Sequence, residues 1–216
     1  MNFDWNFVQE FMPDLLEGLK VTVSAALVSF VFAAIVGLIF ALLRRSSNPW
    51  IKKPIDALVE FVRSTPLLVQ LYFFFYVLPL YGVKLPAFTV GVIGLGLHYS
   101  SYMSEVYRAG IDAIGRGQWE ASRALNFTMK DTWARIILPQ AIPPMIPVLG
   151  NYLIAMFKET PQLAAITVLE MLQRAKNVGA YTFRYLEPIT MVGLLFFIIS
   201  YPAALLVQRL EARYAK

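Results

Sequence analysis

Five long segments of the chain are dominated by apolar residues and contain no Asp, Glu, Lys or Arg. They cover residues 21–43, 64–83, 85–104, 136–157 and 188–208. About 20 apolar residues in a helix cross the hydrocarbon core of a bilayer, and each segment has at least that length. The pattern predicts an all-α integral membrane protein with about five transmembrane helices, arranged as a single domain.

Composition narrows the possible functions further. The chain is 58% hydrophobic and 15% charged, which is outside the range of soluble domains, and no polar segment is long enough for a catalytic domain. It has no cysteine and one histidine, His98, so we expect no metal site. The net charge of +5 is small and spread along a membrane chain, and we expect no nucleic-acid partner.

Basic residues predict the orientation. With the N-terminus outside and the C-terminus in the cytoplasm, 13 of the 19 basic residues lie inside, counting Arg63 and Lys216. The acidic start argues against a cleaved signal peptide. Phe7, Phe11 and Leu15 recur at helical spacing, which favours an amphipathic helix on the outer membrane surface. The alternative is a plain extension of the first membrane helix.

A polar, basic stretch at residues 118–139 interrupts the apolar pattern. It predicts two short helices joined at a corner, with Glu120 in the first turn of the first helix. Asn126 suits a left-handed helix stop, and Thr128 with Asp131 forms a capping pair for the second helix. Pro139 is expected to end that helix. The helix and capping pattern by itself favours a simple interfacial corner.

The same stretch carries a family resemblance. Glu120-Ala121-Ser122, then Asn126, then Ile136, Leu138 and Pro139 resembles the cytoplasmic loop of permease subunits in binding-protein-dependent ABC importers. That family usually has a second Ala where Ser122 stands and Gly where Asn126 stands. The resemblance implies a type I ABC importer permease core whose coupling helix docks on an ATPase subunit. The residues expected at that contact are Gln118, Glu120, Ala121, Ser122, Leu125, Asn126, Ile136, Leu138 and Pro139.

Polar residues inside the second and third segments are candidates for a solute path. Residues 60–70 resemble the path-lining helix of amino-acid-type permeases, and Pro66 should bend it. Glu60 and Arg63 have the spacing of an ordinary ion pair, which is the alternative reading. In the third segment, three polar residues share one helix face, although its cytoplasmic end could simply be solvated. From these segments we expect path residues Arg63, Thr65, Gln70, His98, Tyr102 and Glu105.

The fourth segment is rich in proline. Pro139, Pro143 and Pro144 predict that regular helix begins only at about Pro147 and ends near Phe157. The polar residues 158–162 then interrupt the apolar pattern. Broken helices beside polar residues mark transporter sites, whereas the alternative is an outer loop with an amphipathic helix. The path candidates here are Asn151, Lys158, Glu159 and Thr160. The fifth segment suggests no chemistry.

The resemblance extends from about Leu19 to Tyr214 and is to the polar amino acid uptake class. Residues 94–100, 118–126 and 183–188 resemble the D-type permease subunit of ectoine/hydroxyectoine importers. This implies a small zwitterionic solute, ectoine or hydroxyectoine first, with polar or basic amino acids such as glutamine, arginine or histidine as the alternative. A non-transporting scaffold for an ATPase is a further alternative, whereas a channel would need no docking loop.

The resemblance also implies partners and an organisation. The expected partners are an ATPase dimer, a second permease subunit, an external solute-binding protein and the lipid bilayer of a bacterial inner membrane. The chain lacks the Gly-x4-Gly-Lys-Ser/Thr loop, so we expect it to be no enzyme and to bind no cofactor, with ATP and Mg²⁺ on the ATPase. The expected divisions are an outer segment 1–18, membrane helices at 19–107, a coupling loop 108–139, a broken helix, outer loop and last helix at 140–208, and a cytoplasmic tail 209–216.

Overall fold

The computed structural model describes residues 3–214, so the expectation for Lys216 lies outside the described residues. All regular structure in residues 3–214 is helical, which confirms the predicted class. The elements are α1 Trp5–Arg44, α2 Pro49–Ser64, α3 Leu67–Tyr72, the π-helix η1 Phe73–Val77, the 3-10 helix η2 Leu78–Tyr81, α4 Ala87–Asp112, α5 Arg116–Ala124, α6 Met129–Asp131, the π-helix η3 Thr132–Ile137, α7 Leu138–Glu159, the 3-10 helix η4 Thr160–Ile166, α8 Met171–Thr182 and α9 Leu186–Tyr214.

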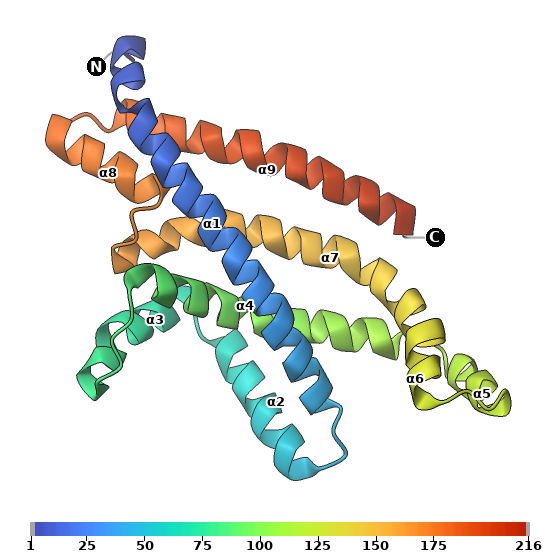
Figure 1. Ribbon diagram of the computed structural model, residues 1–216. Helices are drawn as coiled ribbons and strands as arrows, with labels where there is room; N and C mark the ends of the chain where they lie inside the picture. Colours follow the sequence, from blue (N-terminus) through green and yellow to red (C-terminus); the bar gives the residue numbers. More distant parts are fainter. Residues whose placement is uncertain (1–2, 215–216) are drawn as a thin grey trace.

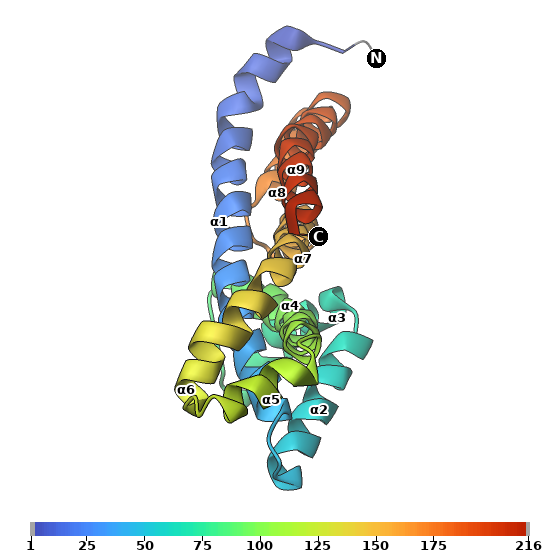
Figure 2. The same cartoon turned by 90° about the vertical axis from the view of Figure 1, so that its right-hand side faces the viewer.

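Helix α1 crosses the other long helices and contacts α2, α4, α7, α8 and α9 (Figures 1 and 2). It packs most extensively along α4. A Cβ added at Gly37 would lie 2.8 Å from the backbone oxygen of Ser100, so only glycine allows this close approach. Ser100, Ser101 and Ser104 are buried on the same side of α4, and each donates to a carbonyl three residues earlier. Small residues therefore bring the two helices together.

Three stretches within residues 3–214 are long and apolar enough to cross a membrane: Trp5–Arg44, Met129–Ile166 and Leu186–Tyr214. The pair Pro49–Ser64 and Leu67–Tyr81, bent by 105°, could form a fourth span. The bend lies at Thr65 and Pro66, which confirms the predicted kink. Helix α4 has the length to cross but is less apolar than these, so residues 3–214 contain three or four candidate spans where the sequence predicted about five.

The start of the chain corresponds to the alternative reading rather than the favoured one. Helix α1 continues from Trp5 to Arg44 without a break at residue 18, although it contains Pro13. Val8, Phe11 and Leu15 are buried against α8 and α9. Their apolar face is therefore covered by protein, which explains the helical spacing without a membrane surface.

The predicted late start of the fourth helix, at about Pro147, is wrong. Helix α7 runs from Leu138 to Glu159 with three internal prolines. Pro143, Pro144 and Pro147 lie within about 100° of one another around the helix axis, so their missing N–H groups fall along one side and the helix bends instead of ending. Figure 1 shows the yellow start of α7 curving towards α5. The interruption expected at residues 158–162 is confirmed, because the α-helix gives way to a 3-10 turn at Thr160.

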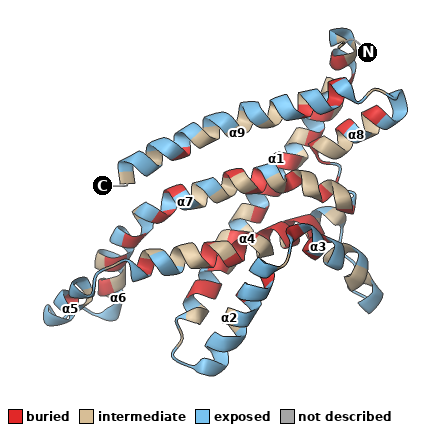
Figure 3. Ribbon diagram, turned by 180° about the vertical axis from the view of Figure 1, so that it is seen from behind, coloured by how far each residue is buried: buried red, intermediate tan, exposed pale blue. Residues whose placement is uncertain are grey.

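Burial is unevenly distributed over the molecule. In Figure 3 buried residues recur along α1, α4 and α7, whereas α9 and α5 are largely exposed. The outward faces of the spanning helices are rich in Leu, Ile, Val and Phe, as helices that face lipid require.

Candidate functional site: an exposed elbow and a charged cleft

The first candidate site is the elbow, residues 115–140, which extends beyond the end of α4 (Figure 1). Asn126 has a φ of 55°, the left-handed conformation expected at a helix stop. Thr128 caps the next helix: its Oγ1 accepts a hydrogen bond from the Asp131 N–H at 3.1 Å. The predicted corner and its capping pair are therefore confirmed.

Two details of the predicted elbow are wrong. Helix α5 begins at Arg116, two residues earlier than expected, so Glu120 is its fifth residue and lies beyond the first turn. Pro139 does not end the second helix but lies at the start of α7. The π-helical turn η3 precedes it, where the Leu138 N–H bonds the Trp133 oxygen five residues back. This wider turn accommodates the proline without breaking the helical path.

Contacts between the two arms hold the elbow together. The rings of Trp119 and Trp133 meet edge to face, with centroids 5.3 Å apart. Gln140 Nε2 donates to the Ile136 oxygen at 2.7 Å and to Gln118 Oε1 at 3.4 Å. Ser122 is buried and donates to the Trp119 oxygen. A small hydroxyl residue is thus accommodated where the family usually has Ala.

The outer face of the elbow is open and partly apolar. Leu125 and Met129 are 70% and 66% exposed, and Phe127 between them is 39% exposed. Glu120, Ala121, Leu138 and Pro139 are exposed as well. Because the elbow's own arms satisfy its buried polar groups, these outward side chains are available for a partner.

The second candidate site is a cleft of about 410 Å³ between α2, α4 and the end of α7. Five of the predicted path residues line it: Arg63, Thr65, His98, Tyr102 and Glu159. Sequence reasoning did not include Gln162, which also lines the cleft and belongs to the polar interruption after α7. Tertiary packing brings these residues together from positions about 100 apart in the chain.

Charges in and beside the cleft form a network. Glu105 lies next to the cleft and accepts from three arginines: Oε1 from Arg44 at 2.7 Å and Arg63 at 3.4 Å, and Oε2 from Arg108 at 2.7 Å. Arg44 also donates from Nε to Asp56 Oδ1 at 2.6 Å, which ties α1 to α2 and α4. No local pattern in the sequence points to Arg44, because its two acidic partners are 12 and 61 residues away.

The remaining predicted path residues lie elsewhere. Gln70 is buried, and its Nε2 donates to the oxygens of Val62 and Thr65, so it stabilises the bend after α2. Thr160 is buried and donates to the Phe157 oxygen. Asn151 and Lys158 are exposed on α7 and do not line the cleft.

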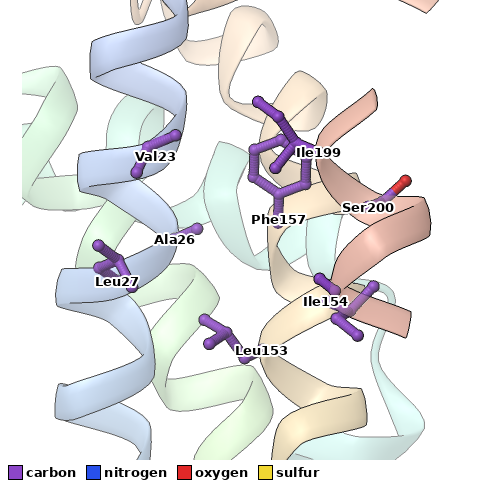
Figure 4. Close-up of a pocket in the computed structure, with 9 residues that line it drawn as sticks. Val23, Ala26, Leu27, Leu153, Ile154, Phe157, Ile199 and Ser200 are labelled. Carbon is purple, nitrogen blue, oxygen red and sulfur yellow. The ribbon is translucent and has the colours of Figure 1, made fainter. Parts of the chain in front are cut away.

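Another hollow, of about 160 Å³, lies between α1, α7 and α9 (Figure 4). Its walls are apolar side chains such as Leu27, Leu153 and Phe157. Ser200 is the polar residue among its lining residues, and its hydroxyl already donates to the Phe196 oxygen at 2.6 Å. This hollow is a gap in helix packing rather than a site for a polar solute. Within residues 3–214, no group of acidic, histidine or cysteine side chains is arranged to hold a metal ion.

The fold and the two sites define a helical membrane protein with an exposed elbow and a polar cleft. Residues 33–216 match the family described as the inner membrane component of binding-protein-dependent transport systems. The chain therefore belongs to this family.

Individual relatives agree over nearly the whole length. The probable amino-acid ABC transporter permease protein y4tG of Sinorhizobium fredii is 44% identical over 215 residues, covering 100% of this chain and 93% of the relative. The L-cystine transport system permease protein TcyB of Bacillus subtilis is 35% identical, with 98% and 93% covered. The crystal structure of an amino acid ABC transporter with histidines superposes with a TM-score of 0.91 at 33% identity, covering 99% of this chain and 100% of that one. These relatives are transport permeases, not enzymes.

Proposed function

We propose that the chain is the permease subunit of an ATP-driven importer for polar or basic amino acids. It lies in the bacterial inner membrane with its N-terminus outside and its C-terminus in the cytoplasm. The names of its relatives support an amino-acid solute better than ectoine, towards which the motif likeness pointed. Ectoine is itself a small zwitterion with one carboxylate, so it belongs among the solutes to be tested.

The observation that carries the proposal is the exposed elbow with its apolar tip. Leu125 and Met129 present hydrophobic surface on a segment whose polar groups are satisfied internally. Such a tip fits a recess on an ATPase subunit, where burial of one leucine side chain contributes roughly 2 kcal/mol. Two permease subunits and two ATPase subunits would assemble around the path, and a solute-binding protein would deliver cargo from outside.

Force applied at the elbow has a direct route to the cleft. Helix α4 ends at Asp112, and α5 begins four residues later. Tyr102 in the cleft lies ten residues before that end, about 15 Å along the helix axis. A movement of the elbow would therefore shift one wall of the cleft as a rigid lever, which suits alternating access.

Substitution of Leu125 tests the docking role. We expect Leu125→Asp to abolish solute uptake and ATPase co-purification, because a charge at the tip opposes burial. Thermal unfolding of the variant should match that of the native chain, since Leu125 makes few internal contacts. The matched control is Leu80→Asp, at an equally exposed leucine in η2 away from the elbow. Normal ATPase co-purification with Leu125→Asp would refute the docking role. A native complex that assembles with the ATPase but moves no solute would favour the alternative of a non-transporting scaffold.

A further inference from the structure

The cleft has two ends of opposite charge. Arg63 lies on its α2 wall, and Glu159 lies on the opposite wall at the end of α7, with His98 and Tyr102 of α4 between them. An arginine suits a carboxylate, which its planar fork can bind with two hydrogen bonds. A carboxylate suits an ammonium or guanidinium group. The arrangement therefore complements a solute with a negative and a positive end.

Arg63 is the loosely held member of its ionic network. Its Nη1 lies 3.4 Å from Glu105 Oε1 and 3.9 Å from Glu60 Oε2. Glu105 makes its short contacts, both at 2.7 Å, with Arg44 and Arg108. Arg63 can consequently turn to a solute carboxylate while the contacts that join α1, α2 and α4 remain. The Tyr102 ring, 5.4 Å from the guanidinium carbon, supports Arg63 from one side.

The opposite end of the cleft has unused hydrogen-bonding capacity. Glu159 Oε2 and His98 Nδ1 are buried and have no hydrogen-bond partner among residues 3–214. Glu159 lines the cleft and has no ion-pair partner among residues 3–214, so its carboxylate can pair with a cationic group of a solute.

The surroundings also limit how much negative charge the cleft can accept. Arg44 and Arg108 offset the charge of Glu105, whereas Glu159 lines the cleft without an ion-pair partner among residues 3–214. One solute carboxylate can pair with Arg63. A second carboxylate on the solute would approach Glu159, and like charges at close range repel strongly in a partly buried site.

We infer that the cleft selects solutes with one carboxylate and at least one cationic group, and discriminates against dicarboxylates. Arg63 binds the carboxylate, Glu159 binds the cationic group, and Glu105 is a positioning residue that sets the orientation of Arg63. This inference rests on the proposed function, because it assumes that the cleft lies on the solute path. Arginine, glutamine and ectoine all satisfy the rule, whereas glutamate does not.

Solute binding to the purified permease–ATPase complex, without the binding protein, tests this inference, because the binding protein has a selectivity of its own. Radiolabelled arginine is displaced by unlabelled arginine, glutamine, ectoine, glutamate or agmatine, which is arginine without its carboxylate. We expect the native complex to bind arginine at least about tenfold more tightly than glutamate or agmatine, as the loss of one charged contact implies.

The variants assign the individual roles. Glu159→Gln and Glu105→Gln should each reduce the arginine-to-glutamate preference about tenfold, and Arg63→Gln should remove the preference for arginine over agmatine. Arg63→Lys should retain that preference. Glu17→Gln, at an exposed carboxylate on α1, is the control and should leave both preferences within about twofold.

The outcomes distinguish a failure of the selectivity inference from a failure of the proposed function. If Glu105 had only a structural role, its variant would weaken arginine and glutamate binding alike and leave their ratio unchanged, which would contradict the positioning role. Ratios that stay within twofold in both glutamate variants would overturn the inference while leaving the importer intact. A native complex that binds none of the amino acids would instead refute the proposed amino-acid path.

Discussion

Polar groups in the elbow bond to near neighbours in the sequence, whereas polar groups in the cleft come from distant parts of the chain. In the elbow, polar side chains bond to backbone groups a few residues away, as Thr128 does to Asp131 and Ser122 to Trp119. In the cleft, Arg63, Tyr102 and Glu159 come from three separate elements, and buried oxygen and nitrogen atoms remain without partners. On the proposed function, the elbow keeps its shape while an ATPase pushes it, and a solute completes the cleft.

Glu170 makes local hydrogen bonds, as the elbow residues do, and is also buried. The largest expected effect on stability is at this residue. It caps α8, accepting from the N–H groups of Leu172 at 2.9 Å and Gln173 at 2.7 Å, yet its side chain is fully buried. Burial raises the pKa of Glu170 to about 7, against the lowering effect of those two hydrogen bonds. Capping hydrogen bonds therefore lower the pKa of this carboxyl, and burial raises it by more.

The pH dependence follows from that raised pKa. Because the folded protein holds the proton more tightly than the unfolded chain, this contribution to stability is fully present below pH 4.5 and is lost as the pH rises through about 7. The loss is on the order of 3 kcal/mol. Thermal unfolding in detergent between pH 4.5 and 8 should show it. Glu170→Gln, which mimics the protonated acid, should flatten the profile, and an equally steep profile in that variant would contradict this assignment.

A smaller effect on stability is expected at Arg44, which pairs with Glu105 beside the cleft. Its side chain is 13% exposed and bridges Asp56 and Glu105. Arg44→Leu leaves Asp56 without its arginine and Glu105 with Arg108 as its remaining short contact. It should cost about 2 kcal/mol, less than a fully buried pair because the acids are partly hydrated. Arg45→Leu, at the neighbouring and more exposed arginine that pairs with Asp112, should cost well under about 1 kcal/mol. Equal unfolding midpoints for the two variants would show that the network does not hold the helices.

The smallest effect is expected at the corner of the elbow. Asn126 has a φ of 55°, so Asn126→Val should destabilise the elbow by about 1–2 kcal/mol through left-handed strain. Asn126→Gly relieves that strain and should be nearly silent. Co-purification of the ATPase would fall with valine and persist with glycine. Equal recovery with both variants would mean that the corner tolerates other conformations.

The comparison also explains which parts of the molecule the sequence could predict. Local physics determines the left-handed Asn126, the Thr128 cap and the kink at Pro66, and all three are present. The failures have local causes as well. Glu120 lies beyond the first turn because α5 begins at Arg116, with Gly115 as its N-cap. Helix α7 begins as early as Leu138 because its internal prolines lie on one side and bend it without ending it.

The sequence by itself determined the helical membrane class, the elbow and the polar residue types available for a solute, since each depends on short-range periodicity or capping. Only the tertiary structure decided which of those polar residues meet. It placed Arg63, His98 and Glu159 around one cleft and gave Glu105 to three arginines, while Gln70 and Thr160 became supports for the backbone. The physical reason is that helix packing, set by small residues such as Gly37, brings distant positions together, and no spacing along the chain encodes that proximity.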